Sequence, residues 1–431
     1  MPSPDRIVIV DGARTPIGSY GGSLSTIPAH ELGAVAVGAA LQRADVEVHE
    51  PQEVIMGCIG QVGADAYNAR RVALASGIPE STPAYTVNRL CGSGLQAIWS
   101  AAMQIRWSGL DIAVAGGDES MSRMPFYDFQ ARAGKKLGDR TLVDGTVCML
   151  TDPFGDVHMG RTAEAVARKY DVTREQQDEF ALQSQQRAGS ETAKAAFHDE
   201  IVPVEVSGRR PTVISADEHP RPETTLEALA KLRPAFEEDG TVTAGNSSGI
   251  NDGAAAVVLS RESVARDRNR SGLVALEHVA TAAMEPGLMG YAPTLALRSL
   301  FDATGLTPAD IDIVELNEAF AAQGRRCRAR HRTRHRTYQS IRRGNRPWTP
   351  GRCHRRHPDA PRRPASPPFR RRVRDRHDVH RRRPSAGGTL SPTGLKFGRP
   401  PWESSRQRFP GAAGTARLQP VRLQLDGAAI Q

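Results

Sequence analysis

Short apolar runs alternate with longer amphipathic stretches along the first part of the chain. Runs typical of buried strands occur at Arg6–Val10, Val54–Cys58, Ala84–Asn88 and Ile112–Gly116. Between them, small and apolar residues recur at helical spacing in Ala29–Arg43 and Gly94–Trp107. Asp11-Gly12 is expected to close the first strand. The alternation predicts an α/β domain with a largely parallel sheet.

From about Ser120 to Gly245 the pattern changes to polar helices and loops, as in an insertion. A helix is expected over Thr173–Lys194, with Thr173 as its cap and Gln176 three positions later. Strand-like or α/β character returns in three later segments: Gly253–Ser260, Gly272–Ala282 and Asp310–Leu316. The sequence thus predicts a second, similar half after the insertion.

Beyond Gln323 the periodicity disappears. Residues 324–431 contain 28 arginines, one lysine and five acidic residues, a net charge of +24, whereas residues 1–323 carry −15. A segment so charged and so poor in apolar runs is expected to be disordered. It also keeps open a second class of function, a nucleic-acid-binding module, because such a tail attracts phosphate backbones. Its few aromatic residues are not interleaved as in stacking platforms, so the expected association is non-specific.

The five cysteines have neither paired nor metal-ligand spacing, which favours a reducing compartment and predicts no metal. The N-terminus lacks a cationic stretch followed by an apolar run, and no run of about eighteen apolar residues occurs. We therefore expect a cytoplasmic protein without a membrane span.

One cysteine lies in a setting suited to nucleophilic chemistry. Val87–Ala97 reads VNRLCGSGLQA and places Cys91 between a predicted strand and a predicted helix, with glycines that permit a sharp turn. At a helix N-terminus the backbone N–H groups favour a thiolate, the nucleophilic form. The alternative is a buried, inert cysteine in a glycine-rich turn.

This segment resembles the nucleophile segment of thiolases, and six further segments resemble that family in the same order. They are DGARTPIG at Asp11–Gly18, AGGDESMS at Ala115–Ser122, TDPFGDVHMGRT at Thr151–Thr162, KLRPAF at Lys231–Phe236, the glycine-rich Thr241–Ala255, and NEAFAAQ at Asn317–Gln323. The resemblance spans residues 5–323.

The resemblance implies duplicated α/β halves that form a five-layer sandwich with an inserted loop domain. The implied divisions are 1–119 and 246–271 for the N-terminal half, 120–245 for the loop domain, 272–323 for the start of the C-terminal half, and 324–431 for a tail foreign to the family. It also implies a homodimer or homotetramer that uses CoA thioesters as substrates, with no cofactor. The implied reaction is the reversible conversion of two acetyl-CoA into acetoacetyl-CoA and CoA. Cleavage of longer 3-ketoacyl-CoA in fatty-acid metabolism stays open.

The resemblance also assigns site residues. Cys91 would accept the acyl group, and Asn317 would hold a water that helps to form an oxyanion hole. The implied substrate and CoA contacts are His158, Met159, Arg221, Ala244, Ser248, Met289 and Phe320. Met289 lies in LMGYAP, where Ala292 departs from the family's usual pattern. Without the resemblance, Asn317 fits a helix cap and Phe320 a core position. His158 and Arg221 then fit solvated side chains.

Two motifs that thiolase chemistry needs are missing after Gln323: the His of Gly-His-Pro and the Cys of Cys-x-Gly-Gly-Gly. If arginine is encoded by CGN codons and Arg342–His357 is read one nucleotide later, the triplets are compatible with a segment containing Gly-His-Pro. The same shift across Arg376–Pro384 is compatible with Cys-Ile-Gly-Gly-Gly, with Val379 where the Cys would be. The sequence therefore predicts a frameshift near Gln323 and severely impaired catalysis by the chain as it stands.

Overall fold

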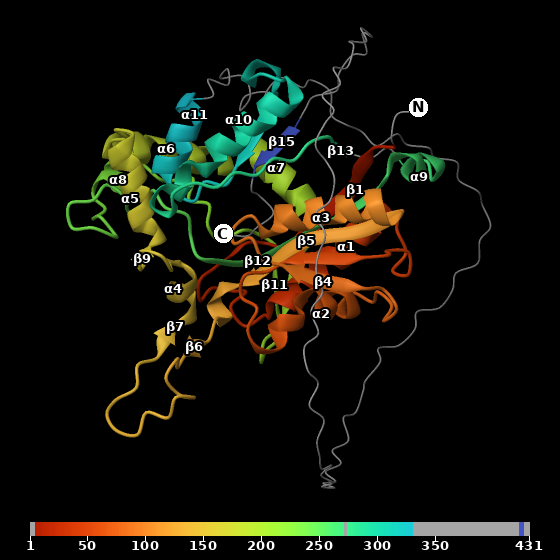
Figure 1. Cartoon of the computed structure of the whole chain (residues 1–431), viewed down its shortest axis with the longest axis horizontal. Coiled ribbons are helices and arrows are strands. Elements are labelled where there is room, and N and C mark those ends of the chain that lie inside the picture. The colour runs from red at the N-terminus through yellow and green to blue at the C-terminus, as the bar shows by residue number, and fades with distance from the viewer. Residues whose placement is uncertain (1–4, 271–273, 331–421, 426–431) are drawn as a thin grey trace, which may run out of the picture. The chain divides into compact units, whose positions relative to one another are not determined.

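The structure, a computed structural model, describes residues 5–270, 274–330 and 422–425 (Figure 1). Its central element is a seven-stranded sheet with the strand order β13-β1-β12-β5-β3-β4, in which β2 pairs with β12. The strands are β1 (Ile7–Arg14), β2 (Gly18–Ser19), β3 (Val54–Gly57), β4 (Ala84–Val87), β5 (Ile112–Ser120), β12 (Asn251–Arg261) and β13 (Val274–Leu276).

The sheet is mixed. β3 pairs in parallel with β4 and β5, but β12 is antiparallel to both β1 and β5, and β13 is antiparallel to β1. The prediction of a largely parallel sheet is therefore wrong for the β12 side. Helical crossovers join β3, β4 and β5, and such connections give parallel neighbours. β12 instead joins the sheet after the whole inserted segment, without a helical crossover directly from β5.

Helices cover both faces of this sheet (Figure 1). The covering helices are α1 (Ala29–Ala44), α2 (Asn68–Ala75) and α3 (Ser93–Ser108). The first two pack on one face with Val54 and Met56, whereas α3 packs on the other face with Ile55. This alternation along β3 is the period of two that a strand imposes. Fully buried leucines of α1, such as Leu32, each contribute about 2 kcal/mol.

β1 continues beyond its predicted end. Asp11 and Gly12 lie inside the strand, and a register shift against β12 falls between Ile9 and Asp11. Gly12 is pressed against the neighbouring strand, where an added Cβ would lie 2.9 Å from the carbonyl oxygen of Ala256. The dipeptide therefore marks an irregularity within the strand and not a turn.

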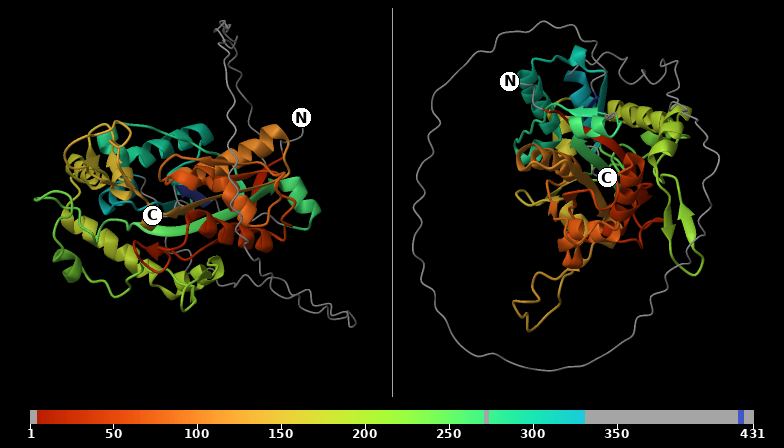
Figure 2. Two further views of the ribbon diagram at one scale, coloured as in Figure 1. Left: turned by 90° about the horizontal axis from the view of Figure 1, so that it is seen from below. Right: turned by 90° about the vertical axis from the view of Figure 1, so that its right-hand side faces the viewer.

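The inserted segment consists of short helices and two-stranded ribbons. The helices are α4 (Gly145–Met149), α5 (Met159–Lys169), α6 (Arg174–Ala188), α7 (Glu191–Glu200) and α8 (Leu226–Ala230). The ribbons pair β6 (Phe126–Tyr127) with β7 (Val143–Asp144), β8 (Thr151–Asp152) with β9 (Val157–His158), and β10 (Val204–Val206) with β11 (Thr212–Ile214). The residues between β6 and β7 form a long loop that projects away from the sheet (Figure 2).

The predicted helix over Thr173–Lys194 is two helices. Thr173 caps α6 by accepting a hydrogen bond from the backbone N–H of Gln176, as expected. Gly189 ends α6, and Ser190 caps α7. Packing requires a glycine at this position, because an added Cβ would lie 2.4 Å from Cβ of Pro222.

The chain after the sheet adds short elements. They are α9 (Glu262–Asp267), η3 (Pro286–Tyr291), α10 (Ala292–Thr304), η4 (Pro308–Asp310), β14 (Ile313–Leu316), α11 (Ala321–Arg330) and β15 (Arg422–Leu425), the last paired in parallel with β14. Of the tail expected to be disordered, the structure describes only Gly324–Arg330 and β15. The expectation is wrong for Gly324–Cys327, which belong to α11 with Cys327 buried. The rest of the predicted tail lies outside the described residues. No helix among residues 5–270 and 274–330 is long and apolar enough to cross a bilayer.

Candidate functional site

The nucleophile segment forms a sharp turn between β4 and α3. Cys91 is half-buried and comes directly before Gly92, the N-cap of α3. Leu90 has a left-handed backbone with φ 48°, and the Asn88 side chain accepts a hydrogen bond from its N–H at 2.9 Å. The predicted strand–cysteine–helix arrangement is confirmed. Cys91 therefore lies at the N-terminus of a helix, where the helix dipole favours negative charge.

The turn lies directly against the neighbouring strand. A Cβ added to Gly57, the last residue of β3, would lie 2.4 Å from the carbonyl carbon of Ser93. Beyond Gly57, the buried Glu119 of β5 accepts hydrogen bonds from the N–H groups of Ile59 and Gly60 at 2.8 and 2.9 Å. Burial raises the pKa of the Glu119 carboxyl, and the two backbone donors offset part of that rise. Sequence reasoning matched the motif that contains Glu119 but gave this residue no role.

An aromatic stack joins two of the predicted site residues. The imidazole of His158 stacks on Phe236 with ring centroids 4.9 Å apart, and Phe236 meets Phe320 edge-on at 6.1 Å. A Cβ added to Gly160 would lie 2.3 Å from the Phe236 ring, so a glycine is required beside it. Phe236 was missed as a site residue, although it ends the KLRPAF motif, because a motif does not show which of its side chains faces a ligand.

His158 also caps α5. Its Nδ1 accepts a hydrogen bond from the N–H of Gly160 at 3.1 Å, and this leaves the ring proton on Nε2. Burial lowers the pKa of His158, so the imidazole is neutral at neutral pH. Met159, the next residue, is half-buried in the first turn of the same helix.

Two loops that carry further predicted residues are joined by backbone hydrogen bonds. The N–H of Ser248 donates to the carbonyl of Ala319 at 2.9 Å, and the N–H of Ala321 donates to the carbonyl of Asn246 at 2.9 Å. The structure thus brings the loop with Ala244 and Ser248 against the loop with Asn317 and Phe320. Asn317 is not a helix cap, because α11 begins only at Ala321.

Buried polar side chains of α5 and α6 hold the Ser248 loop in place by hydrogen bonds. Glu164 of α5 accepts hydrogen bonds from the N–H groups of Thr241 and Val242 at 2.8 and 2.7 Å. Asn246 donates its side-chain amide to Asp178 of α6 at 2.9 Å. Single polar residues inside amphipathic helices give no sequence signal for such a role, so this support was missed.

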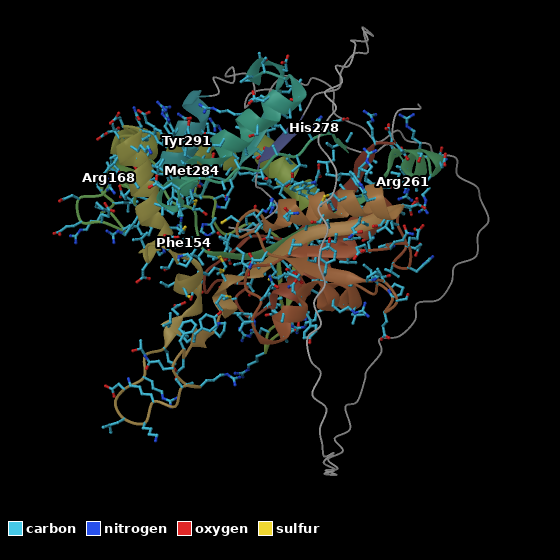
Figure 3. All side chains as sticks on the ribbon, in the orientation of Figure 1. Phe154, Arg168, Arg261, His278, Met284 and Tyr291 are labelled. Atoms are coloured by element: carbon cyan, nitrogen blue, oxygen red, sulfur yellow. The ribbon has the colours of Figure 1, made fainter. Side chains whose placement is uncertain are left out.

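The remaining two predicted residues lie at the edges of this region. Met289 is half-buried in η3, which packs on α5 and α11. In the same element lies Tyr291, which Figure 3 labels. Its ring packs on that of Tyr170, with centroids 4.6 Å apart. Arg221 is exposed, and its N–H donates to the Gln185 side chain at 2.7 Å.

The segment before Arg221 links it to the Ser248 loop. The His219 imidazole lies against Gly249, where an added Cβ would be 2.1 Å from the ring. Among residues 5–270 and 274–330, no group of three or more His, Cys, Asp or Glu side chains has an arrangement that could hold a metal ion.

Comparisons with known proteins show which family the chain resembles. The model of the thiolase N-terminal domain matches residues 7–263, and that of the thiolase C-terminal domain matches residues 271–335. An acetyl-CoA acetyltransferase of Allochromatium vinosum is 44% identical over 322 residues, which cover 74% of this chain and 82% of the relative.

Two solved structures are also similar. The Bacillus anthracis acetyl-CoA acetyltransferase is 40% identical with a TM-score of 0.75, over 77% of this chain and 84% of that one. Human mitochondrial 3-ketoacyl-CoA thiolase is 41% identical with a TM-score of 0.73, over 76% and 84%.

Proposed function

Because this chain belongs to the thiolase family, we propose that it is an acyl-CoA C-acetyltransferase with Cys91 as its nucleophile. The observation that carries the proposal is the position of Cys91 in a tight turn at the N-terminus of α3. A thiolate there attacks the thioester carbonyl of acetyl-CoA, forms acetyl-Cys91 and releases CoA. In the family, the Cys of the Cys-x-Gly-Gly-Gly motif then removes an α-proton from a second acetyl-CoA. The resulting α-carbanion attacks the carbonyl of acetyl-Cys91, which gives acetoacetyl-CoA and releases the Cys91 thiolate.

The other residues serve substrate binding and charge stabilisation. Asn317 holds a water that helps to form an oxyanion hole, and donors of this kind lower a barrier by about 3 kcal/mol. Phe320 walls the acyl pocket and Met289 faces the substrate, while His158 and Met159 lie beside the acyl pocket and the pantetheine. Ser248 lies at the pantetheine with Ala244 on the same loop, and Arg221 lies near the CoA nucleotide. The hydrogen bonds between the Ser248 and Phe320 loops and the aromatic stack support these roles.

The direct test is acylation of Cys91. Incubation with acetyl-CoA should place one acetyl group on the Cys91 peptide, detectable by mass spectrometry, and release one equivalent of CoA. Cys91→Ser should lose this product, whereas Cys148→Ser, on the half-buried thiol of α4, should keep it. Acetylation that persists in Cys91→Ser would refute the proposal.

The second candidate within this chemistry is cleavage of longer 3-ketoacyl-CoA in fatty-acid metabolism. The similarity to human mitochondrial 3-ketoacyl-CoA thiolase favours it. Both reactions pass through the same acyl-cysteine. Comparing the rates at which acetyl-CoA and longer acyl-CoA acylate Cys91 distinguishes them, and a faster reaction with the longer chain supports the second candidate.

We also propose that the reading frame changes near Gln323, and that the chain as it stands is therefore severely impaired. The C-terminal family model matches no further than residue 335, and the Gly-His-Pro and Cys-x-Gly-Gly-Gly motifs are absent from the sequence beyond Gln323. Sequencing the coding DNA across codons 318–390 tests the proposal. Ordinary thiolysis by a verified 431-residue product would contradict the expected impairment.

Assembly, location and partners complete the proposal. The protein forms a homodimer or homotetramer, which sedimentation would measure, and it works in the cytoplasm without a cofactor. The arginine-rich tail adds only non-specific association with nucleic acid, which should weaken steeply with salt. Tight, sequence-selective DNA binding that survives Cys91→Ala would instead favour a nucleic-acid-binding protein.

A further inference from the structure

We infer that Ser93 is a positioning residue for Cys91, because its buried hydroxyl closes the nucleophile turn and holds Leu90 in its left-handed conformation. The side-chain oxygen accepts a hydrogen bond from the N–H of Arg89 at 2.8 Å and donates one to the carbonyl of Leu90 at 2.6 Å. Ser93 is 3% exposed. The inference rests on the proposed function, since it concerns how the same thiol is presented.

The turn needs such a restraint because Leu90 is in an unfavourable conformation. A left-handed backbone crowds Cβ against the following carbonyl oxygen in every residue except glycine. The Leu90 side chain is 59% exposed, so its own packing offers little compensation. The conformation therefore depends on hydrogen bonds to the backbone on either side of Leu90, and strain retained in this way is common at functional sites.

The side chains of Asn88 and Ser93 both form hydrogen bonds to this turn, and those of Ser93 are better shielded from water. Asn88 accepts from the Leu90 N–H at 2.9 Å, but Asn88 is exposed and water competes for that bond. The Ser93 hydroxyl is shielded and links the chain on both sides of the Arg89–Leu90 peptide. The backbone N–H of Ser93 also donates to the Leu90 carbonyl at 2.9 Å.

Packing determines which way the turn moves if this hydroxyl is lost. Gly57 of β3 lies directly beneath Ser93 and leaves no room for even one added carbon, so the turn cannot relax toward the sheet. It can relax only toward solvent, where Asn88, Arg89 and Leu90 are already exposed. That movement carries Cys91 away from the N-terminus of α3, and its thiolate loses the stabilisation of the helix N–H groups.

The test measures alkylation of Cys91 by iodoacetamide across a pH series in the full chain. Ser93→Ala should slow alkylation at neutral pH by about tenfold and move the midpoint of its pH profile upward. Alkylation of Cys148 serves as the internal control and should not change. A Ser93→Ala protein with the original rate and midpoint at Cys91 would overturn the inference.

A second variant tests whether the hydroxyl acts through Leu90. Leu90→Gly added to Ser93→Ala should restore most of the rate, because glycine adopts φ 48° without the Cβ penalty. If Ser93→Ala alone fails to fold, the double variant still tests the inference, because it removes the strain at Leu90. A double variant as slow as Ser93→Ala, or one that does not fold, contradicts the role assigned to Leu90.

The proposed function is tested separately, by measuring acetylation by acetyl-CoA in the same protein samples. If the unsubstituted chain takes no acetyl group from acetyl-CoA while Ser93→Ala still slows alkylation, the acyltransferase proposal fails and the positioning of Cys91 by Ser93 stands.

Discussion

At the scale of single residues, Asp118 combines a buried carboxyl with an unusual protonation equilibrium. It lies on β5 at 2% exposure, and a Cβ added to Gly33 of α1 would lie 2.3 Å from its Oδ2. Burial raises the pKa of Asp118 well above 3.8, and the nearby Asn68 amide offsets only part of that rise. The folded protein therefore keeps this proton to a higher pH than the unfolded chain does.

This difference makes stability depend on pH. The contribution of Asp118 is fully present below pH 3.8 and is lost as the pH rises through its raised folded-state pKa. Asp118→Asn, which is neutral at every pH, should remove that decline and raise the free energy of unfolding at neutral pH by about 1 to 3 kcal/mol. Urea unfolding at several pH values measures it. The exposed Asp199→Asn is the control, and identical pH dependence in both variants would contradict the prediction.

At the scale of elements, the start of α5 fixes the aromatic stack. Gly160→Ala improves helix propensity by less than about 1 kcal/mol. However, the added methyl group would lie 2.3 Å from the Phe236 ring, and such overpacking lowers stability by about 1 to 3 kcal/mol. We expect lower stability and weaker acetyl-CoA binding, with alkylation of Cys91 unchanged. Gly38→Ala in α1 is the control, because a Cβ added there would meet no neighbouring group within 4 Å, and it should leave acetyl-CoA binding unchanged. Equal binding by both variants would show that Phe236 does not shape the site.

Elements were predictable where local pattern decides them. α1 and β3 match their predicted ranges to within one residue, because their apolar spacing differs clearly from that of their neighbours. The antiparallel position of β12 was not predictable. Its residues pair with residues far away in the sequence, such as Arg261 with Ile7, and no local pattern indicates which strand will be the neighbour. The division of the predicted helix at Gly189 was readable in principle, because a glycine followed by a capping serine marks a helix end and a helix start.

At the scale of the whole molecule, the proposed site residues are distributed over both family domains. Cys91 and His158 belong to the part matched by the N-terminal model, whereas Met289, Asn317 and Phe320 belong to the C-terminal match. The sequence predicted these residues only through the resemblance, because a lone Asn or Phe has no chemistry that distinguishes it from a cap or a core residue. The side chains that connect them, such as Phe236 and Glu164, were found only in three dimensions.

If the reading frame changes near Gln323 as proposed, restoring it should complete the catalytic set. A gene with one nucleotide removed near codon 323 should encode a product with the Gly-His-Pro and Cys-Ile-Gly-Gly-Gly segments. Its thiolysis rate should exceed that of the present chain by about 10³-fold or more, as expected when missing catalytic groups are regained. Thiolysis of acetoacetyl-CoA by CoA measures this. Equal rates for the two proteins would contradict the frame proposal.

The position of β12 between β1 and β5 has a consequence for synthesis on the ribosome. β1 is made first, but its pairing with β12 begins only at Ala255 and is complete only at Arg261. The sheet therefore stays unfinished while the whole inserted segment is synthesised. Pairing at such separation is slow, because loop closure precedes any gain from contacts. Yet β13 ends at Leu276, ahead of Gln323. The N-terminal sheet can thus be completed during translation before the codons beyond the proposed frame change are read.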